Sequence, residues 1–150
     1  MTERKPSWNA YWALRLALGV VPIVAGLDKF TNLLADWQGY LSPLAVRLLP
    51  FSGSTFMHLA GVVEVAVGVA ILTGHARVFG WVAMAWLGAI ALNLITTGHF
   101  LDVAARDAVM AVAAAALAQL AQLHERAPAA RQASPDPRPL GGAGPAASRP

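Results

Sequence analysis

The sequence contains no cysteine and few charges, since only 13% of its 150 residues are Asp, Glu, Lys or Arg. Without cysteine, this chain forms no disulfide, holds no thiolate-bound metal and performs no thiol redox chemistry. A redox role would therefore depend on a cofactor, a lipid-soluble carrier or a partner protein. The glycines also lack the flanking residues of a P-loop, a dinucleotide-binding fingerprint or a hydrolase nucleophile elbow, so no motif of these three enzyme classes is present.

Histidine is scarce as well, with four residues in the chain. His58 and His99 are the candidates for a metal site, but they lack the short HxxxH-type spacing that metal-binding histidines on one helix show. We therefore predict no bound metal and expect each of these two histidines to act as a hydrogen-bond partner.

Apolar residues, in contrast, make up 57% of the chain. This share is too high for an ordinary soluble domain of the same size. Four segments each approach the roughly 20 residues that cross about 30 Å of hydrocarbon, namely 11–30, 54–74, 78–97 and 101–123. We therefore predict an all-α protein, an integral membrane four-helix bundle over residues 11–123, with the lipid bilayer as its partner.

Charges near the ends of these segments predict an orientation in the membrane. The first segment follows basic residues as a signal peptide would, but no small-residue cleavage site follows it, so we expect a retained anchor after a short lead, residues 1–10. The positive-inside rule places both termini in the cytoplasm. We read the net charge of +3 as an orientation signal and predict no nucleic-acid binding. The basic residues of the cytoplasmic side are Arg4, Lys5, Arg77, Arg126 and Arg131, against Lys29 and Arg47 on the outer side.

Two segments lie outside the predicted spans. Residues 31–53 are rich in leucine and are expected to lie at the membrane surface as a short interfacial segment, with Pro43 starting a short helix. Ser54 or Thr55 is expected to cap the helix that follows. Residues 124–150 are rich in proline and small residues and are predicted to form a disordered cytoplasmic tail.

Glu64 lies at the middle of the second apolar segment, so a bilayer would hold its carboxylate near the midplane. One central acidic residue costs about 3 kcal/mol of insertion free energy, whereas the surrounding Val, Ile, Leu and Phe residues contribute about −4 kcal/mol, so the segment still inserts. An intramembrane ionisable residue indicates a functional site by default, and the alternative is a polar clamp that only holds helices together. Gly61 and Gly68 share its helical face, which allows a neighbouring helix to approach closely.

The first helix offers two partners for this carboxylate. Arg15, Gly19, Gly26 and Lys29 lie on one stripe, which we place toward the other helices. Two arrangements remain open for Arg15. Its guanidinium either extends to the lipid headgroups or pairs with Glu64.

The polar residues of the four segments converge toward the outer side of the membrane under this topology. In a four-helix bundle, facing side chains of different helices build the site, so the simplest model is an outward-facing polar pocket with Glu64 as its floor. Asp102 and Arg106 have the spacing and order that favour an ion pair on one helix. No catalytic role is assigned. The predicted pocket residues are Arg15, Lys29, His58, Glu64, Asn93, His99, Asp102, Arg106 and Asp107.

Charged and small residues recur together at three places along the chain. The motifs are Arg15-Leu-Ala-Leu-Gly19 with Ala25-Gly26-Leu-Asp-Lys29-Phe30, then Gly61-Val-Val-Glu64-Val-Ala-Val-Gly68, and Asp102-Val-Ala-Ala-Arg106-Asp107. Over residues 11–123 they resemble the DoxX-like family of small bacterial membrane proteins with four helices. The family takes its name from a subunit of a thiosulfate:quinone oxidoreductase. The resemblance therefore implies a quinone-linked or redox-associated role in the bacterial plasma membrane, with a quinone as the ligand and a redox partner subunit. It also implies that Arg15, Lys29, Glu64, Arg106 and Asp107 belong to the pocket.

Three hypotheses for the function remain open. The leading one is a membrane subunit of a quinone-dependent oxidoreductase, because a quinone head group needs hydrogen-bond donors and an ionisable residue, which His58, Glu64 or Arg106 would supply, with lateral access from lipid. The second is a small-solute or proton-coupled transporter, in which Glu64 would exchange between protonated and ionised states. The third is a non-catalytic assembly subunit, in which buried polar residues only lock helices. Each of the three allows a homo-oligomer.

Overall fold

The computed structural model describes the backbone of residues 6–133 and the side chains of residues 9–126. All regular secondary structure in this part of the chain is helical, which confirms the predicted all-α class. The predicted lead, residues 1–10, and the predicted tail, residues 124–150, lie partly outside the described residues.

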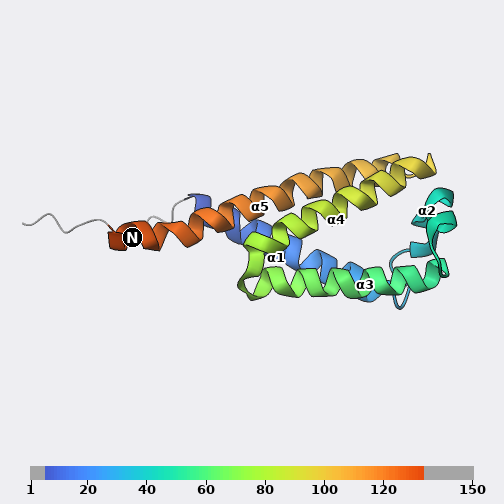
Figure 1. Ribbon diagram of the computed structural model, residues 1–150, viewed down its shortest axis with the longest axis horizontal. Coiled ribbons are helices and arrows are strands. Elements are labelled where there is room, and N and C mark those ends of the chain that lie inside the picture. Colours follow the sequence, from blue (N-terminus) through green and yellow to red (C-terminus); the bar gives the residue numbers. More distant parts are fainter. Residues whose placement is uncertain (1–5, 134–150) are drawn as a thin grey trace, which may run out of the picture.

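Four long helices make up most of the structure (Figure 1). They are α1 (Pro6–Asp28), α3 (Gly53–Ala70), α4 (Ala76–Thr97) and α5 (Leu101–Ala133). The segment between α1 and α3 contains a 3-10 turn, η1 (Trp37–Tyr40), and a short helix, α2 (Pro43–Leu48). As predicted, Pro43 opens this short helix, and the hydroxyl of Ser42 caps it by accepting a hydrogen bond from the Ala45 N–H at 3.1 Å.

The cap of α3 differs from the prediction. The hydroxyl of Ser52 accepts a hydrogen bond from the Thr55 N–H at 3.2 Å, so Ser52 is the cap rather than Ser54 or Thr55. The backbone of Ser52 is extended, as a cap residue requires, and the helix starts at Gly53 immediately after it. The apolar run alone does not mark this boundary, because the cap is the last residue with an extended backbone before the helix begins.

The C-terminal helix is longer than predicted. The sequence predicts an end near residue 123 and a disordered tail from residue 124, whereas α5 continues to Ala133. The added stretch consists mostly of Ala, Gln, Glu and Arg, which are strong helix formers, and this propensity outweighs the proline at position 128. The predicted tail from residue 134 onward lies outside the described residues.

Two helical stretches among the described residues are long and apolar enough to cross a membrane, Asn9–Asp28 and Gly53–Thr97. The second is broken within a π-helical turn, η2 (Ile71–His75), where Gly74 adopts a φ of 114° and a ψ of −1°. Residues with a Cβ rarely adopt this conformation, so glycine is suited to the break. The chain reverses there, so α3 and α4 run antiparallel and both extend from the turn toward the same side of the molecule (Figure 1).

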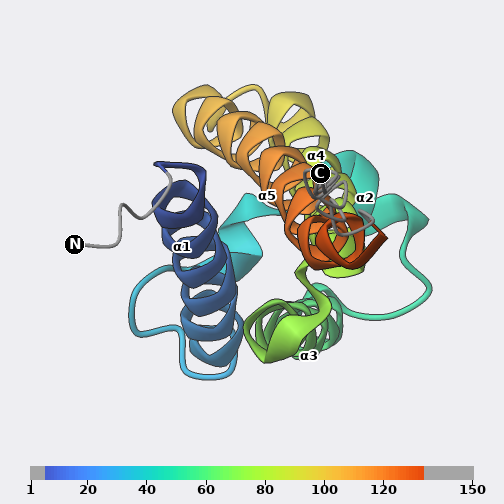
Figure 2. The ribbon, with the colours of Figure 1, turned by 90° about the vertical axis from the view of Figure 1, so that its left-hand side faces the viewer.

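The long helices pack chiefly as two pairs, α1 with α3 and α4 with α5 (Figure 2). In the first pair the backbones nearly touch, because a Cβ on Gly61 would lie 2.6 Å from the carbonyl oxygen of Gly26, and one on Gly68 would lie 2.5 Å from that of Gly19. This geometry confirms the close approach predicted for the helical face of Glu64. Small residues also join the second pair, where Gly80 packs against Ala118.

The two pairs diverge with distance from η2, and α2 lies at the wide end (Figure 1). Near the narrow end, a hydrophobic cluster that includes Leu18, Ile71 and Leu117 joins α1, η2 and α5. The space that holds the candidate site therefore lies between the pairs, beyond this cluster.

The glycine contact between α1 and α3 generates a stability prediction. We expect Gly61→Ala to lower the free energy of unfolding in detergent by about 1–3 kcal/mol, because the new methyl group overpacks the Gly26 carbonyl. Gly88→Ala is the matched control, since a Cβ on Gly88 meets nothing within 4 Å and alanine favours helix by up to about 1 kcal/mol. Thermal melts followed by circular dichroism measure both variants. Equal melting temperatures for the two variants would contradict the close contact.

Candidate functional site

A cavity of about 460 Å³ lies between the two helix pairs. All four long helices and the segment between α1 and α3 contribute to its wall, which is mainly apolar. Pocket volumes of about 300–1,000 Å³ with a few placed polar groups are typical of small-molecule sites. The predicted polar pocket is thus corrected in one respect, because polar side chains occupy only part of an apolar wall. Those of the predicted residues that line the cavity are Lys29, Glu64, Asn93, Arg106 and Asp107.

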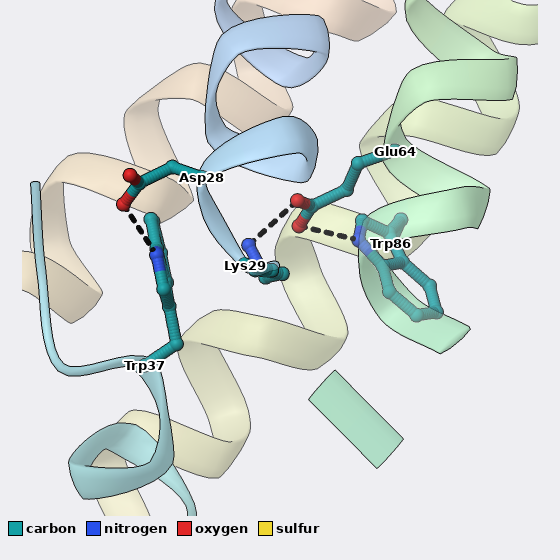
Figure 3. Close-up of polar contacts among 5 residues, drawn as sticks. All are labelled: Asp28, Lys29, Trp37, Glu64 and Trp86. Atoms are coloured by element: carbon teal, nitrogen blue, oxygen red, sulfur yellow. Dashed lines mark hydrogen bonds and ion pairs between the residues drawn. The ribbon is translucent and has the colours of Figure 1, made fainter. Parts of the chain in front are cut away.

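The centre of the site is a buried ion pair between Lys29, just after α1, and Glu64, in the middle of α3 (Figure 3). The Lys29 Nζ lies 2.6 Å from the Glu64 Oε2, and the two side chains are only 5% and 7% exposed. The second carboxylate oxygen, Oε1, accepts a hydrogen bond from the Trp86 Nε1 of α4 at 3.3 Å. One carboxylate therefore connects three helices, and each of its oxygens has a donor.

Trp37 covers the lysine from the side of the connecting segment. Its ring centroid lies 3.6 Å from the Lys29 Nζ, a cation–π contact, and its Nε1 donates to the Asp28 Oδ2 at 2.8 Å (Figure 3). The Asp28 carboxylate also accepts hydrogen bonds from the backbone N–H groups of Leu33 and Leu34. Asp28 thereby ties the segment to the end of α1 and places the indole over the cation.

Asn93 of α4 holds the other side of the same segment. Its Nδ2 donates to the Tyr40 carbonyl oxygen at 2.7 Å, and its Oδ1 accepts from the Ser42 N–H at 3.1 Å. Both partners of the Asn93 amide therefore belong to the connecting segment. This segment, including Trp37 and Tyr40, contributes wall to the wide end of the cavity, which the sequence predicts to be open.

Arg106 and Asp107 form the second charged pair of the cavity. The Arg106 Nε donates to the Asp107 Oδ1 at 3.3 Å, where the sequence predicts a pair with Asp102. Asp107 is buried and faces the cavity, whereas Asp102 is exposed in the first turn of α5. The i, i+4 spacing makes the Asp102 contact available, but the buried carboxylate benefits more from a charged donor because water screens it less.

Arg15 does not pair with Glu64, and its contact with lipid headgroups stays a prediction. Its Nε and one terminal nitrogen, Nη2, donate to the carbonyl oxygens of Ile71 and Leu72 at 2.9 and 2.7 Å. Its guanidinium also lies 4.8 Å from the Trp12 ring centroid. The carbonyl oxygens at the C-terminal end of a helix carry partial negative charge, so the Arg15 cation stabilises the end of α3. Arg15 therefore fixes the narrow end of the structure, far from the carboxylate of Glu64.

The histidines lie outside the cavity. The His58 ring stacks on Phe30, with a centroid distance of 5.1 Å and an interplanar angle of 3°, and His99 is exposed in the turn between α4 and α5. Stacking is not the hydrogen bonding expected for His58. Within the described residues, no group of three or more His, Cys, Asp or Glu side chains has the arrangement of a metal site.

Comparison with family models gives one match, the DoxX model, over residues 10–105. The chain belongs to the DoxX family. It is a membrane protein, and the match covers α1, α3, α4 and the first turn of α5. Lys29, Glu64 and Asn93 of this DoxX protein lie inside the matched range, whereas Arg106 and Asp107 lie just beyond it. Comparisons with curated proteins and with solved structures gave no match.

Sequence reasoning missed three aromatic residues of the DoxX cavity, Trp37, Tyr40 and Trp86. For Trp86 a signal was present, because it precedes Asn93 by seven residues and so lies on the same face of α4. No comparable signal marks Trp37 and Tyr40, since they lie in an irregular segment whose path depends on hydrogen bonds to Asp28 and Asn93.

The buried ion pair generates the second prediction. Lys29→Met leaves the Glu64 carboxylate buried without its cation and is expected to lower the free energy of unfolding by about 3–5 kcal/mol. The double variant Lys29→Met/Glu64→Leu is expected to recover most of this loss, because apolar residues of similar volume replace the pair. Detergent unfolding curves measure both variants.

The exposed pair between Arg77 and Glu125 is the matched control for this prediction. Arg77→Met removes a pair whose side chains are about half exposed, so it is expected to change the stability by less than about 1 kcal/mol. A double variant as unstable as Lys29→Met alone would show that the two charges do not act as a unit.

Proposed function

We propose that this DoxX protein is a multi-pass protein of the bacterial plasma membrane that binds a quinone in the cavity around Glu64 and works with a redox partner subunit. The buried ion pair in a mainly apolar cavity is the observation that carries this proposal. The pair contributes charged hydrogen-bonding groups to the wall of a space large enough for a small molecule. A clamp that only joins helices needs no such space beside it.

The proposal includes four membrane crossings over about residues 11–30, 54–74, 78–97 and 101–123, with both termini in the cytoplasm. Large apolar side chains project from all four long helices and are well exposed, as a surface that faces lipid requires. Examples are Leu16 of α1, Val62 of α3, Leu92 of α4 and Val112 of α5. The exposed Leu33, Leu44 and Leu48 of the connecting segment fit a position at the membrane surface.

A quinone head group matches the chemistry of the cavity wall. Its ring is flat and apolar on both faces, and its carbonyl oxygens accept hydrogen bonds at the edge. The Lys29 ammonium carries three N–H donors, of which Glu64 accepts one, and Lys29 lines the cavity, so a remaining donor is proposed to bind a quinone carbonyl. The Arg106 guanidinium offers further donors, and Trp37 and Trp86 offer ring faces for stacking.

Quinone binding by the purified protein is the third prediction. Titration with a short-tailed benzoquinone in detergent, followed by tryptophan fluorescence, is expected to show saturable binding. Glu64→Gln is expected to weaken the affinity by about tenfold or more, because a charged partner that orients the Lys29 ammonium is lost, and hydrogen bonds to charged groups contribute about 1.5–3 kcal/mol.

Glu125→Gln is the control, since it removes a carboxylate from the exposed pair with Arg77 and leaves the cavity unchanged. Unchanged quinone affinity in Glu64→Gln would contradict the proposal. Solute flux into proteoliposomes that depends on Glu64, without any quinone affinity, would favour the transporter. Lower stability of the Glu64 variant together with normal binding per folded molecule would favour the assembly subunit.

A further inference from the structure

A second hollow, of about 430 Å³, lies on the side of the molecule where α1 faces α5. Its wall consists of three valines and an alanine of α1, four residues of the connecting segment that include Leu34 and Trp37, and Arg106 of α5. Val20, Val21 and Val24 are all about half exposed, so this hollow opens on the outer surface of the helices.

The hollow and the cavity share part of their walls. Val21, Ala25, Trp37, Tyr40 and Arg106 line both of them. These side chains therefore lie between the outer surface at α1 and α5 and the space beside the Lys29–Glu64 pair. The shared residues come from three separate segments, namely α1, the connecting segment and α5.

Contacts between other elements cross the remaining sides of the cavity. Glycines bring α1 and α3 into backbone contact, and small residues do the same for α4 and α5. Between α3 and α4, Trp86 reaches across to Glu64. The wide end is crossed by the segment that Asn93 holds through Tyr40, and the narrow end is filled by the hydrophobic cluster around Ile71.

We propose that this hollow is a lateral portal, through which the hydrocarbon tail of a lipid-soluble ligand passes between α1 and α5 while its carbonyl-bearing head lies at Lys29 and Glu64. The inference rests on the proposed quinone binding and narrows the ligand class to a tailed quinone, as opposed to a small water-soluble one. The tail lies along Val20 and Val24. Its contacts with these valines replace its contacts with lipid, so the tail enters the protein without exposure to water.

The polar groups at the inner edge of the portal fit this placement. Arg106 is 65% exposed and is paired with the buried Asp107, so its guanidinium lies where an apolar tail meets a polar head. The ring of Trp37 lies on the other side of the same passage, above the Lys29 ammonium. A head that enters between Arg106 and Trp37 arrives directly at the ion pair.

A photoreactive benzoquinone with a diazirine on its decyl tail tests the route in protein reconstituted into phospholipid nanodiscs. Irradiation followed by peptide mass spectrometry is expected to label residues 20–24 and 34–35, and excess tailed quinone without the diazirine is expected to suppress the labelling. Displaceable labels on the outer faces of α3 or α4 instead would overturn the portal and leave the quinone site in place.

A variant pair provides the second measurement. Val24→Trp fills the hollow and is expected to weaken binding of the tailed benzoquinone by at least about tenfold, or ~1.4 kcal/mol, while the tail-less head group binds as in the wild type. Val62→Trp, at a similarly exposed valine of α3 away from both spaces, is expected to change neither affinity.

Equal affinity of the Val24 and Val62 variants for the tailed quinone would refute the portal alone. If the wild-type protein binds neither form of quinone, the proposed function fails and the portal fails with it.

Discussion

The pairing of Lys29 with Glu64 is the constraint on which the arrangement of the helices depends. Two charges removed from water carry a desolvation cost of several kcal/mol each, and only close geometry with further hydrogen bonds compensates for it. The structure meets this condition with a 2.6 Å contact, an indole N–H from Trp86 on the second carboxylate oxygen and the ring of Trp37 over the ammonium. The contacts of the two charges thereby join the end of α1, α3, α4 and the connecting segment.

Close backbone contact is what makes this geometry possible. Gly26 and Gly61 bring α1 within reach of α3 one turn away from the ion pair, and Gly19 with Gly68 continues the contact toward η2. Because each pair of helices is held together by small residues, bulky side chains are left to fill the space between the pairs, and near η2 they form a continuous hydrophobic cluster. The cavity is thus a consequence of two tight pairs that diverge, and the polar pair lies where the core packing ends.

Much of this follows from the sequence, because length, apolar runs and small residues at helical spacing depend on local geometry. The positions of the long helices, the short helix at Pro43 and the close face around Glu64 were predictable for that reason. Periodicity places a residue on a face and at a depth, but it does not say which neighbour it meets. Arg15 and Lys29 lie on one stripe, and by charge both could pair with Glu64, yet of the two only Lys29 contacts it. Arg15 instead donates to two backbone carbonyls beside the break at Gly74, and a hydropathy pattern does not show such a break. The contacts of Asn93 with the connecting segment could not be predicted either, because the path of an irregular segment has no periodicity.

The connecting segment bears on which ligand the cavity suits. It is fixed at both sides by polar residues, Asp28 through Trp37 and Asn93 through Tyr40. These hydrogen bonds hold the connecting segment across the wide end of the cavity. The hollow between α1 and α5, in contrast, is lined partly by valines and partly by side chains that it shares with the cavity. A solute arriving from water would have to pass the covered end and lose its hydration against an apolar wall. A molecule already dissolved in the bilayer meets no such barrier at the valines, so the placement of the polar contacts favours a lipid-soluble ligand over a water-soluble one.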